Sequence, residues 1–316
     1  MFQTKVKIPD SPLKISHQDS ILSLGSCFAE NIGKRLTGTY FDVDINPFGV
    51  LYNPLSIKNS LNSLMDKQKF TKDDLFENRG LWQSFSHSSL FSDISEELCL
   101  NKINERFLKA KEQLKTSRQL IITFGTAWVY DELKSGRVVS NCHKLPSNVF
   151  NRRRLSVEEI VDNYTELFEK LFSYNPDLEL IFSVSPIRHW KDGAHENNIS
   201  KSTLLLSINS LQENFSTVHY FPAYEIQLDE LRDYRFYGAD MQHPSDVAVN
   251  YIWERFKMTY FSTSTIALIE KLEQLNDDLN HRPLFPQSDE YKLFVKSIET
   301  RKLRLVKEYP FLEGHF

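Results

Sequence analysis

The stretch Ser20-Ile-Leu-Ser-Leu-Gly-Ser-Cys-Phe-Ala-Glu-Asn-Ile-Gly-Lys-Arg-Leu36 joins an apolar run to an amphipathic pattern across a single glycine. Residues 20–25 predict a short buried strand, and residues 29–36 have the apolar spacing of a helix. Glu30 falls in the first turn of that helix, where the positive end of the helix dipole favours a carboxylate. A buried strand that turns directly into a helix is the opening unit of a parallel α/β fold.

The same alternation continues through most of the chain. Apolar runs predict three further strands over residues 120–124, 178–184 and 218–221. Amphipathic patterns predict helices over residues 54–65, 101–116, 156–172, 200–214 and 246–260, with Asn101, Ser156 and Ser245 as N-caps. Near-continuous apolar strands alternating with helices predict a parallel sheet covered by helices on both faces.

The last fifty residues follow a different pattern. Strand signals stop near residue 262, and two charged helices are expected over residues 264–280 and 288–308, separated by Pro283 and Pro286. We expect domains over residues 1–262 and 263–316, the second a helical extension packed on the core or on a partner subunit. A homo-oligomer formed through these C-terminal helices is therefore an open alternative.

Composition limits the class of protein. The chain has 316 residues, 41% of them hydrophobic, with a formal net charge of −4. This charge gives no reason to expect a nucleic-acid partner, and the cluster at residues 152–154 is interpreted as a solvated helix start or face. Three cysteines at unrelated spacings suggest neither a disulfide framework nor a zinc site. Without an apparent signal peptide or membrane-spanning run, we expect a cytoplasmic protein without cofactor or metal.

The first candidate for chemistry is Cys27. It follows the glycine that ends the first strand, and it stands where free N–H groups and the helix dipole stabilise an anion. Such a setting favours a reactive thiolate. The alternative is that Cys27 is a small buried residue, which is the usual behaviour of a free cysteine.

The second candidate is the segment Asp240-Met-Gln-His243. A carboxylate three residues before a histidine on a turn can hold one imidazole nitrogen, so that the other nitrogen faces a nucleophile. A capping aspartate next to a surface histidine is the alternative interpretation.

Other polar residues follow predicted strands, where ligands bind in open parallel sheets. Gly125 and Thr126 suit a close backbone approach to substrate, and Arg188 suits a carboxylate or phosphate. Asn141, Cys142, His143 and Lys144 form a dense polar group, although adjacent Cys142 and His143 are a weak metal pattern. Gly49 is a candidate N–H donor to an oxyanion, and residues 85–88 are interpreted as a surface loop.

Gly25-Ser-Cys-Phe-Ala29 resembles the signature of the GSCFA family, which is itself similar to the SGNH/GDSL hydrolases. Further similarity runs through Gly125–Trp128, Asn141–Lys144, Ser185–His189 and Asp240–Pro244, so it covers roughly residues 15–262. The resemblance implies a three-layer α/β/α sandwich with a five-stranded parallel sheet. It also implies a nucleophile after the first strand and an Asp-x-x-His pair late in the chain.

Laying the Gly-Asp-Ser-Leu motif over this signature puts Cys27 at the nucleophile position, with Ser26 as the alternative if the turn is displaced by one residue. His243 then acts as base and Asp240 as the carboxylate that orients it. The oxyanion asparagine of SGNH enzymes is replaced, since Gly125-Thr126 leads to Ala127. We expect Asn141 or His143 as substitute donors, beside the N–H groups of Cys27 and Gly49.

These residues predict acyl chemistry on an ester, thioester or amide of a carbohydrate or another small molecule, by hydrolysis or by transfer. One rival is a non-catalytic protein that grips an anionic or sugar ligand through Arg188, His143 and Lys144. Another is a structural partner protein that acts through residues 264–316.

Overall fold

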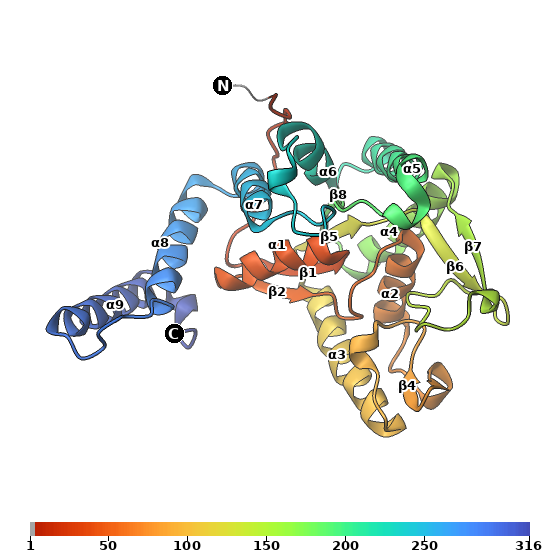
Figure 1. Ribbon diagram of the computed structural model, residues 1–316, viewed down its shortest axis with the longest axis horizontal. Helices are drawn as coiled ribbons and strands as arrows, with labels where there is room; N and C mark the ends of the chain where they lie inside the picture. The colour runs from red at the N-terminus through yellow and green to blue at the C-terminus, as the bar shows by residue number, and fades with distance from the viewer. Residues whose placement is uncertain (1–3) are drawn as a thin grey trace.

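The computed structural model describes residues 4–316, and a five-stranded sheet forms its centre (Figure 1). All neighbouring strands are parallel, in the order β2-β1-β5-β8-β9. The strands are β1 (Ser20–Gly25), β2 (Asp42–Ile45), β5 (Gln119–Phe124), β8 (Glu179–Val184) and β9 (Val218–Tyr220). The predicted five-stranded parallel sheet is confirmed.

Alternate residues of each central strand supply two separate hydrophobic cores. Leu22, Leu120 and Leu180 are in register across the sheet and point into one core. Ile121 and Ile181 are in register one position further along and belong to the other. Because side chains alternate across a strand, a fully apolar strand requires cover on both of its faces.

Helices provide that cover, which makes the predicted three-layer sandwich. One face is packed by α2 (Pro54–Asp66), α3 (Glu96–Thr116), α4 (Val157–Tyr174) and α5 (Gly193–Asn214). The other is packed by α1 (Cys27–Gly38), α7 (Asp246–Tyr260) and the short α6 (Ala223–Glu225). The cores are filled from both sides, so the carboxyl edge of the sheet is left for the loops.

Helix starts follow the predicted caps with one exception. The hydroxyls of Ser156 and Ser245 accept hydrogen bonds from backbone N–H groups of the first turns of α4 and α7. Helix α3, however, begins at Glu96 and is capped by Ser95, not by Asn101. Asn101 lies inside this helix as an exposed residue, where an asparagine costs little.

Two hairpins lie outside the central sheet: β3 (Phe76–Asn78) with β4 (Leu81–Gln83), and β6 (Trp128–Glu132) with β7 (Phe150–Arg154). The interpretation of residues 152–154 as a helix start or face is wrong, because they form the end of β7. Arg152 pairs with Asp192 at 2.5 Å, Arg153 with Asp131 and Glu159 at 2.8 Å, and Arg154 with Glu196 at 2.6 Å. Extended backbone lets these arginines reach carboxylates on several different elements.

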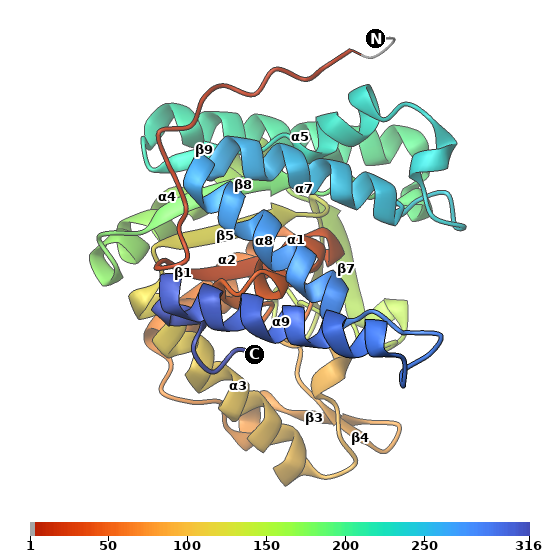
Figure 2. The ribbon, with the colours of Figure 1, turned by 90° about the vertical axis from the view of Figure 1, so that its left-hand side faces the viewer.

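The C-terminal extension consists of α8 (Thr263–Leu279) and α9 (Asp289–Glu308), which share a small apolar core of their own. Figure 2 shows α8 lying across the side of the molecule that carries α1 and α7. Asn276 donates to the Gly38 carbonyl at 2.6 Å and accepts from the Tyr40 hydroxyl at 2.8 Å. The predicted helical extension is therefore present and contacts the end of α1. Within residues 4–316, no helix combines the length and apolar character needed to cross a bilayer.

Candidate active site

A cavity of about 520 Å³ opens at the carboxyl edge of the sheet. Its wall is built from the segments that follow β1, β5 and β8, from the β6–β7 hairpin and from the loop before α7. Its lining includes these residues singled out in the sequence: Ser26, Cys27, Thr126, Asn141, Cys142, Arg188 and His243. The chain thus brings Cys27 and His243, more than two hundred positions apart, into one cavity.

Gly25 makes the turn that presents Cys27. Its φ of +146° lies outside the usual range of L-residues, and a Cβ there would lie 2.3 Å from the Thr123 carbonyl oxygen. The Gly25 N–H donates to Asn46 Oδ1 at 2.9 Å, and the Ser26 N–H donates to the Thr123 oxygen at 3.2 Å. The backbone of β1 therefore ends pressed against β5, with the next residues directed into the cavity.

The two candidate nucleophiles differ in how free they are. Ser26 is the N-cap of α1: its hydroxyl accepts from the Phe28 N–H at 3.2 Å, and the residue is 2% exposed. Cys27 is the first residue of α1 and is partly exposed. Its Sγ lies 3.7 Å from the Tyr52 hydroxyl. A capping hydroxyl is tied to the backbone, so Cys27 is the more accessible group.

Asp240 and His243 form the pair expected from their spacing. Asp240 Oδ2 lies 2.5 Å from His243 Nδ1, and Oδ1 accepts the N–H groups of Gln242 and His243 at 2.9 and 3.0 Å. The hydrogen bonds from the backbone N–H groups of His243 and Gln242, followed by that from the imidazole, lower the pKa of Asp240 to about 2. An ionised carboxylate at Nδ1 leaves Nε2 as the nitrogen available to the cavity.

Several predicted oxyanion donors are already used by the protein. The Gly49 N–H donates to the Asn46 carbonyl at 2.7 Å, while the Gly125 and Thr126 N–H groups both donate to the Tyr52 carbonyl, at 2.7 and 2.9 Å. Gly49 and Gly125 do not line the cavity. Asn141 does, and its Oδ1 accepts from the His143 N–H at 2.8 Å.

His143 lies away from Cys27. Its ring is buried, with Nε2 2.8 Å from the Ser84 carbonyl oxygen, and with Lys144 it borders a different hollow beside the β3–β4 hairpin. Burial lowers the pKa of this imidazole, so it is neutral at pH 7. A positive φ at both residues turns the chain away from the cavity after Cys142. The expectation that His143 and Lys144 contribute to the same pocket is therefore not met by the geometry.

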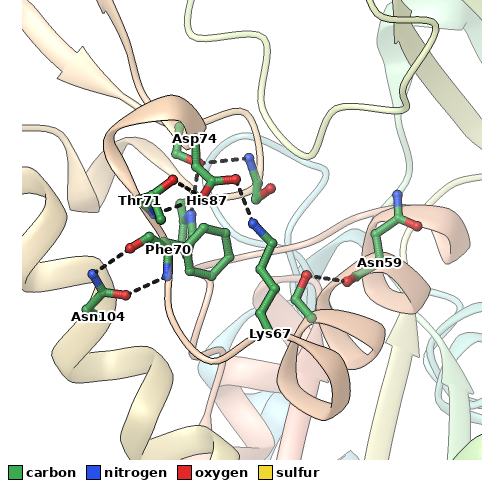
Figure 3. Close-up of polar contacts among 10 residues, drawn as sticks. Asn59, Lys67, Phe70, Thr71, Asp74, His87 and Asn104 are labelled. Atoms are coloured by element: carbon green, nitrogen blue, oxygen red, sulfur yellow. Dashed lines mark hydrogen bonds and ion pairs between the residues drawn. The ribbon is translucent and has the colours of Figure 1, made fainter.

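The structure also differs from the sequence-based interpretation at residues 85–88, which was that of a surface loop. His87 is 1% exposed, and its ring stacks on Phe48 at a centroid distance of 5.0 Å. Burial lowers its pKa to about 3. Figure 3 shows the polar contacts around it. Asn104 accepts from the Phe70 N–H and donates to the Phe70 carbonyl, and Asp74 accepts from Lys67 and from the Thr71 N–H. These contacts hold residues 67–74, and the Phe70 ring packs against His87 at a centroid distance of 4.8 Å, so this histidine has a structural position.

Three residues in or next to the cavity wall were not singled out individually from the sequence. Tyr52 and His189 line the cavity, and their rings meet edge to face at 5.9 Å. Burial, and after it the nearby Lys201, lower the pKa of His189 to about 4. Lys201 is fully buried and donates to the carbonyls of Gly125 and Ser185, both at 2.7 Å. Tyr52 follows β2, an edge strand whose Asp-Val-Asp-Ile sequence carries no apolar run; recognising that strand would have pointed to Tyr52.

Part of the cavity wall is basic and aromatic. Arg152 lies over the Trp128 ring at 4.1 Å, and Arg188 lies over the Trp190 ring at 5.2 Å. Lys191 donates to the Tyr130 hydroxyl at 3.1 Å. Cys142 also lines the cavity, and burial raises the pKa of its thiol. In the part of the chain that the structure describes, no three His, Cys, Asp or Glu side chains are grouped to hold a metal ion.

Comparisons with known proteins agree with the signature at Gly25–Ala29. The profile of the GSCFA family matches residues 20–256, and that of the GSCFA domain protein C-terminal domain matches residues 266–315. No curated protein gives a match.

The chain is similar to two solved structures at low identity and low TM-score. A carbohydrate esterase family 3 protein from Talaromyces cellulolyticus is 10% identical with a TM-score of 0.36, over 79% of this chain and 97% of the other. The acetyl xylan esterase Est2A from the rumen bacterium Butyrivibrio proteoclasticus is 12% identical with a TM-score of 0.39, over 87% of this chain and 66% of the other. The profile match at residues 20–256 contains every strand of the central sheet and every residue that lines the cavity, and on this evidence the chain belongs to the GSCFA family.

Proposed function

We propose that the protein is an acyl-transfer or hydrolytic enzyme that carries its acyl group as a thioester on Cys27. The observation that carries the proposal is that Cys27 and His243 line one cavity, with Asp240 bound to His243 Nδ1 and the thiol at a helix N-terminus. A nucleophile, a base and a group that orients the base are the minimum set for covalent acyl chemistry.

The reaction would proceed in two halves. His243 takes the thiol proton, and the Cys27 sulfur attacks the carbonyl carbon of an ester, thioester or amide. The tetrahedral intermediate collapses as the bond to the leaving group breaks, and His243 returns the proton to that group. Water, an alcohol or an amine then gives its proton to His243 and attacks the thioester, which releases the acyl product and restores the thiol.

Charge is supported at two points in this sequence. Asp240 stays ionised at neutral pH, so it stabilises the imidazolium that forms in each half-reaction. The Cys27 N–H, at the N-terminus of α1, would face the oxygen that becomes negative, and Asn141 would supply a side chain from the same cavity lining. A carbohydrate or another small molecule is the substrate class that we propose.

An activated ester tests the proposal directly. We expect the wild-type protein, mixed with p-nitrophenyl acetate, to release p-nitrophenol and to gain one acetyl group at Cys27 by intact-mass and peptide analysis. Cys27→Ala should abolish both signals. Cys142→Ala is the matched control, because that thiol lines the same cavity and should leave the adduct unchanged. An adduct that survives in Cys27→Ala contradicts the proposal.

A second candidate is a ligand-binding protein on the same fold, favoured by Ala127 standing where an oxyanion asparagine is expected. Iodoacetamide labelling as a function of pH separates the two. A thiol that titrates well below its ordinary value of about 8.5 supports catalysis. A Cys27 that is unshifted or inert supports binding alone.

A further inference from the structure

We propose that the Tyr52 hydroxyl is a side-chain oxyanion donor of this site, in the place of the asparagine that the chain lacks. The inference rests on the proposed acyl chemistry at Cys27 and names a catalytic residue for it.

A side-chain donor is needed because several backbone N–H groups beside the cavity already have acceptors. The Gly125 and Thr126 N–H groups at the end of β5 both donate to the Tyr52 carbonyl, and the Gly49 N–H donates to Asn46. Ala127 has no side-chain donor, and its N–H donates to the Ser200 hydroxyl at 2.8 Å. None of these four N–H groups is free for a developing oxyanion, so the start of α1 needs a further donor beside it.

Tyr52 places a hydroxyl where that oxyanion would form. Its oxygen lies 3.7 Å from Cys27 Sγ. In the tetrahedral intermediate the negative oxygen is two bonds from that sulfur, and effective donors lie about 2.7–3.1 Å from the oxyanion. A hydroxyl at this distance from the sulfur is within hydrogen-bond range of that oxygen when the oxygen points toward Tyr52.

The side chain is also held rigidly, as a preorganised donor must be. The two hydrogen bonds from Gly125 and Thr126 fix the Tyr52 backbone, and His189 packs against the ring edge to face. A Cβ at Gly125 would lie 3.0 Å from the Tyr52 carbonyl oxygen and 3.3 Å from its ring. The absence of a side chain at Gly125 thus allows Tyr52 to approach β5, which explains a glycine at this position.

The hydroxyl keeps its proton under ordinary conditions. Burial in the cavity wall, followed by the neighbouring Cys27, raises the pKa of Tyr52 to about 12. Tyr52 is therefore a neutral donor at neutral pH and does not compete with His243 as a base.

Tyr52→Phe tests the inference, because it removes the hydroxyl and keeps the ring. We expect the rate of acetylation by p-nitrophenyl acetate, and kcat with it, to fall about 10²–10³-fold with little change in KM. Alkylation by iodoacetamide forms no oxyanion, so its rate at Cys27 should stay close to that of the wild type. Tyr130→Phe is the matched control: it removes another hydroxyl from the lining of the same cavity and should leave acetylation unchanged.

Each other outcome counts against the inference. Acetylation within about threefold of the wild-type rate in Tyr52→Phe shows that the hydroxyl is not needed. Equal losses in acetylation and alkylation show that Tyr52 acts on the thiol or on the fold instead. A wild-type protein that forms no acyl adduct overturns the proposed function as well, so the two failures are distinguishable.

Discussion

Gly25 positions the nucleophile through the backbone alone. Its left-handed φ and its contact with Thr123 allow β1 to end one residue before the helix cap, so that Ser26 caps α1 and Cys27 opens it. A side chain here meets backbone atoms of a central strand, which have no room to move.

We predict that Gly25→Ala lowers the free energy of unfolding by about 2 kcal/mol or more, through backbone strain and the clash with Thr123. Acetylation of Cys27 should fall in the protein that still folds. Gly38→Ala is the control, since a Cβ at that position, at the end of α1, has no atom within 4 Å. Urea unfolding of the three proteins measures the effect. Equal stabilities for Gly25→Ala and Gly38→Ala would show that the turn tolerates a side chain.

At the scale of elements, apolar runs identified β1, β5, β8 and β9, because buried parallel strands have little freedom of composition. Apolar runs did not predict edge strand β2 or the β6–β7 hairpin, because the residues of these strands are half-exposed and polar: Asp-Val-Asp-Ile in β2, and three consecutive arginines in β7. Their partners lie far along the chain or across a long turn, so no local pattern marks them. The sequence predicted Cys27, Asp240 and His243 as site residues because their motifs are local. It did not point to Tyr52 and Lys201, because these residues matter through contacts with distant strands.

Helix α5 contains a buried lysine, and burial opposes the charged form of its amine. Its Lys201 is fully buried, and it holds the carboxyl ends of β5 and β8 together by donating to Gly125 and Ser185. Burial, with the added repulsion of Arg188, lowers the pKa of this amine to about 7. The lysine of the unfolded chain keeps its ordinary value of 10.5.

Between these two pKa values the unfolded chain binds a proton that the folded protein lacks. Stability therefore rises with pH across the window from about 7 to 10.5, and the full cost of charging Lys201 is present below it. We predict that Lys201→Met removes this pH dependence, which is up to about 1.4 kcal/mol in the free energy of unfolding per pH unit. The variant should also be less stable overall, because two carbonyls lose their donor. Urea unfolding of both proteins at pH 7, 8 and 9 measures the difference. A difference in stability that does not vary with pH would contradict the shifted amine.

At the scale of the whole molecule, the C-terminal extension contacts the core away from the cavity. Helix α8 meets the end of α1, and Phe311 stacks on His17 at a centroid distance of 5.0 Å. Self-association through these helices stays a prediction, as does the division of the chain at residue 262. Sedimentation velocity of the full chain beside a Leu303→Glu variant, which changes an exposed apolar residue of α9, is the direct measurement.

The overall charge of −4 contrasts with the cavity, where positive side chains dominate one wall. Arg152 is neutralised by Asp192, but within residues 4–316 neither Arg188 nor Lys191 forms an ion pair: Arg188 donates to Asn198 at 3.1 Å, and Lys191 to Tyr130. Two basic groups over aromatic rings, unpaired beside a nucleophile, favour a substrate that carries its own negative charge.

We therefore predict that a p-nitrophenyl ester with an acidic acyl group, such as the hemisuccinate, has a lower KM than the uncharged acetate. Added salt should raise that KM, because these cations are accessible to solvent ions. Arg188→Gln and Lys191→Gln should each raise the KM of the anionic ester about two- to fivefold, corresponding to about 0.5–1 kcal/mol, and leave that of the acetate unchanged. Lys134→Gln, at an exposed turn outside the cavity, should change neither value. If the two esters respond alike to salt and to both cavity substitutions, the basic wall serves the fold through its aromatic contacts, and the substrate is held by other groups.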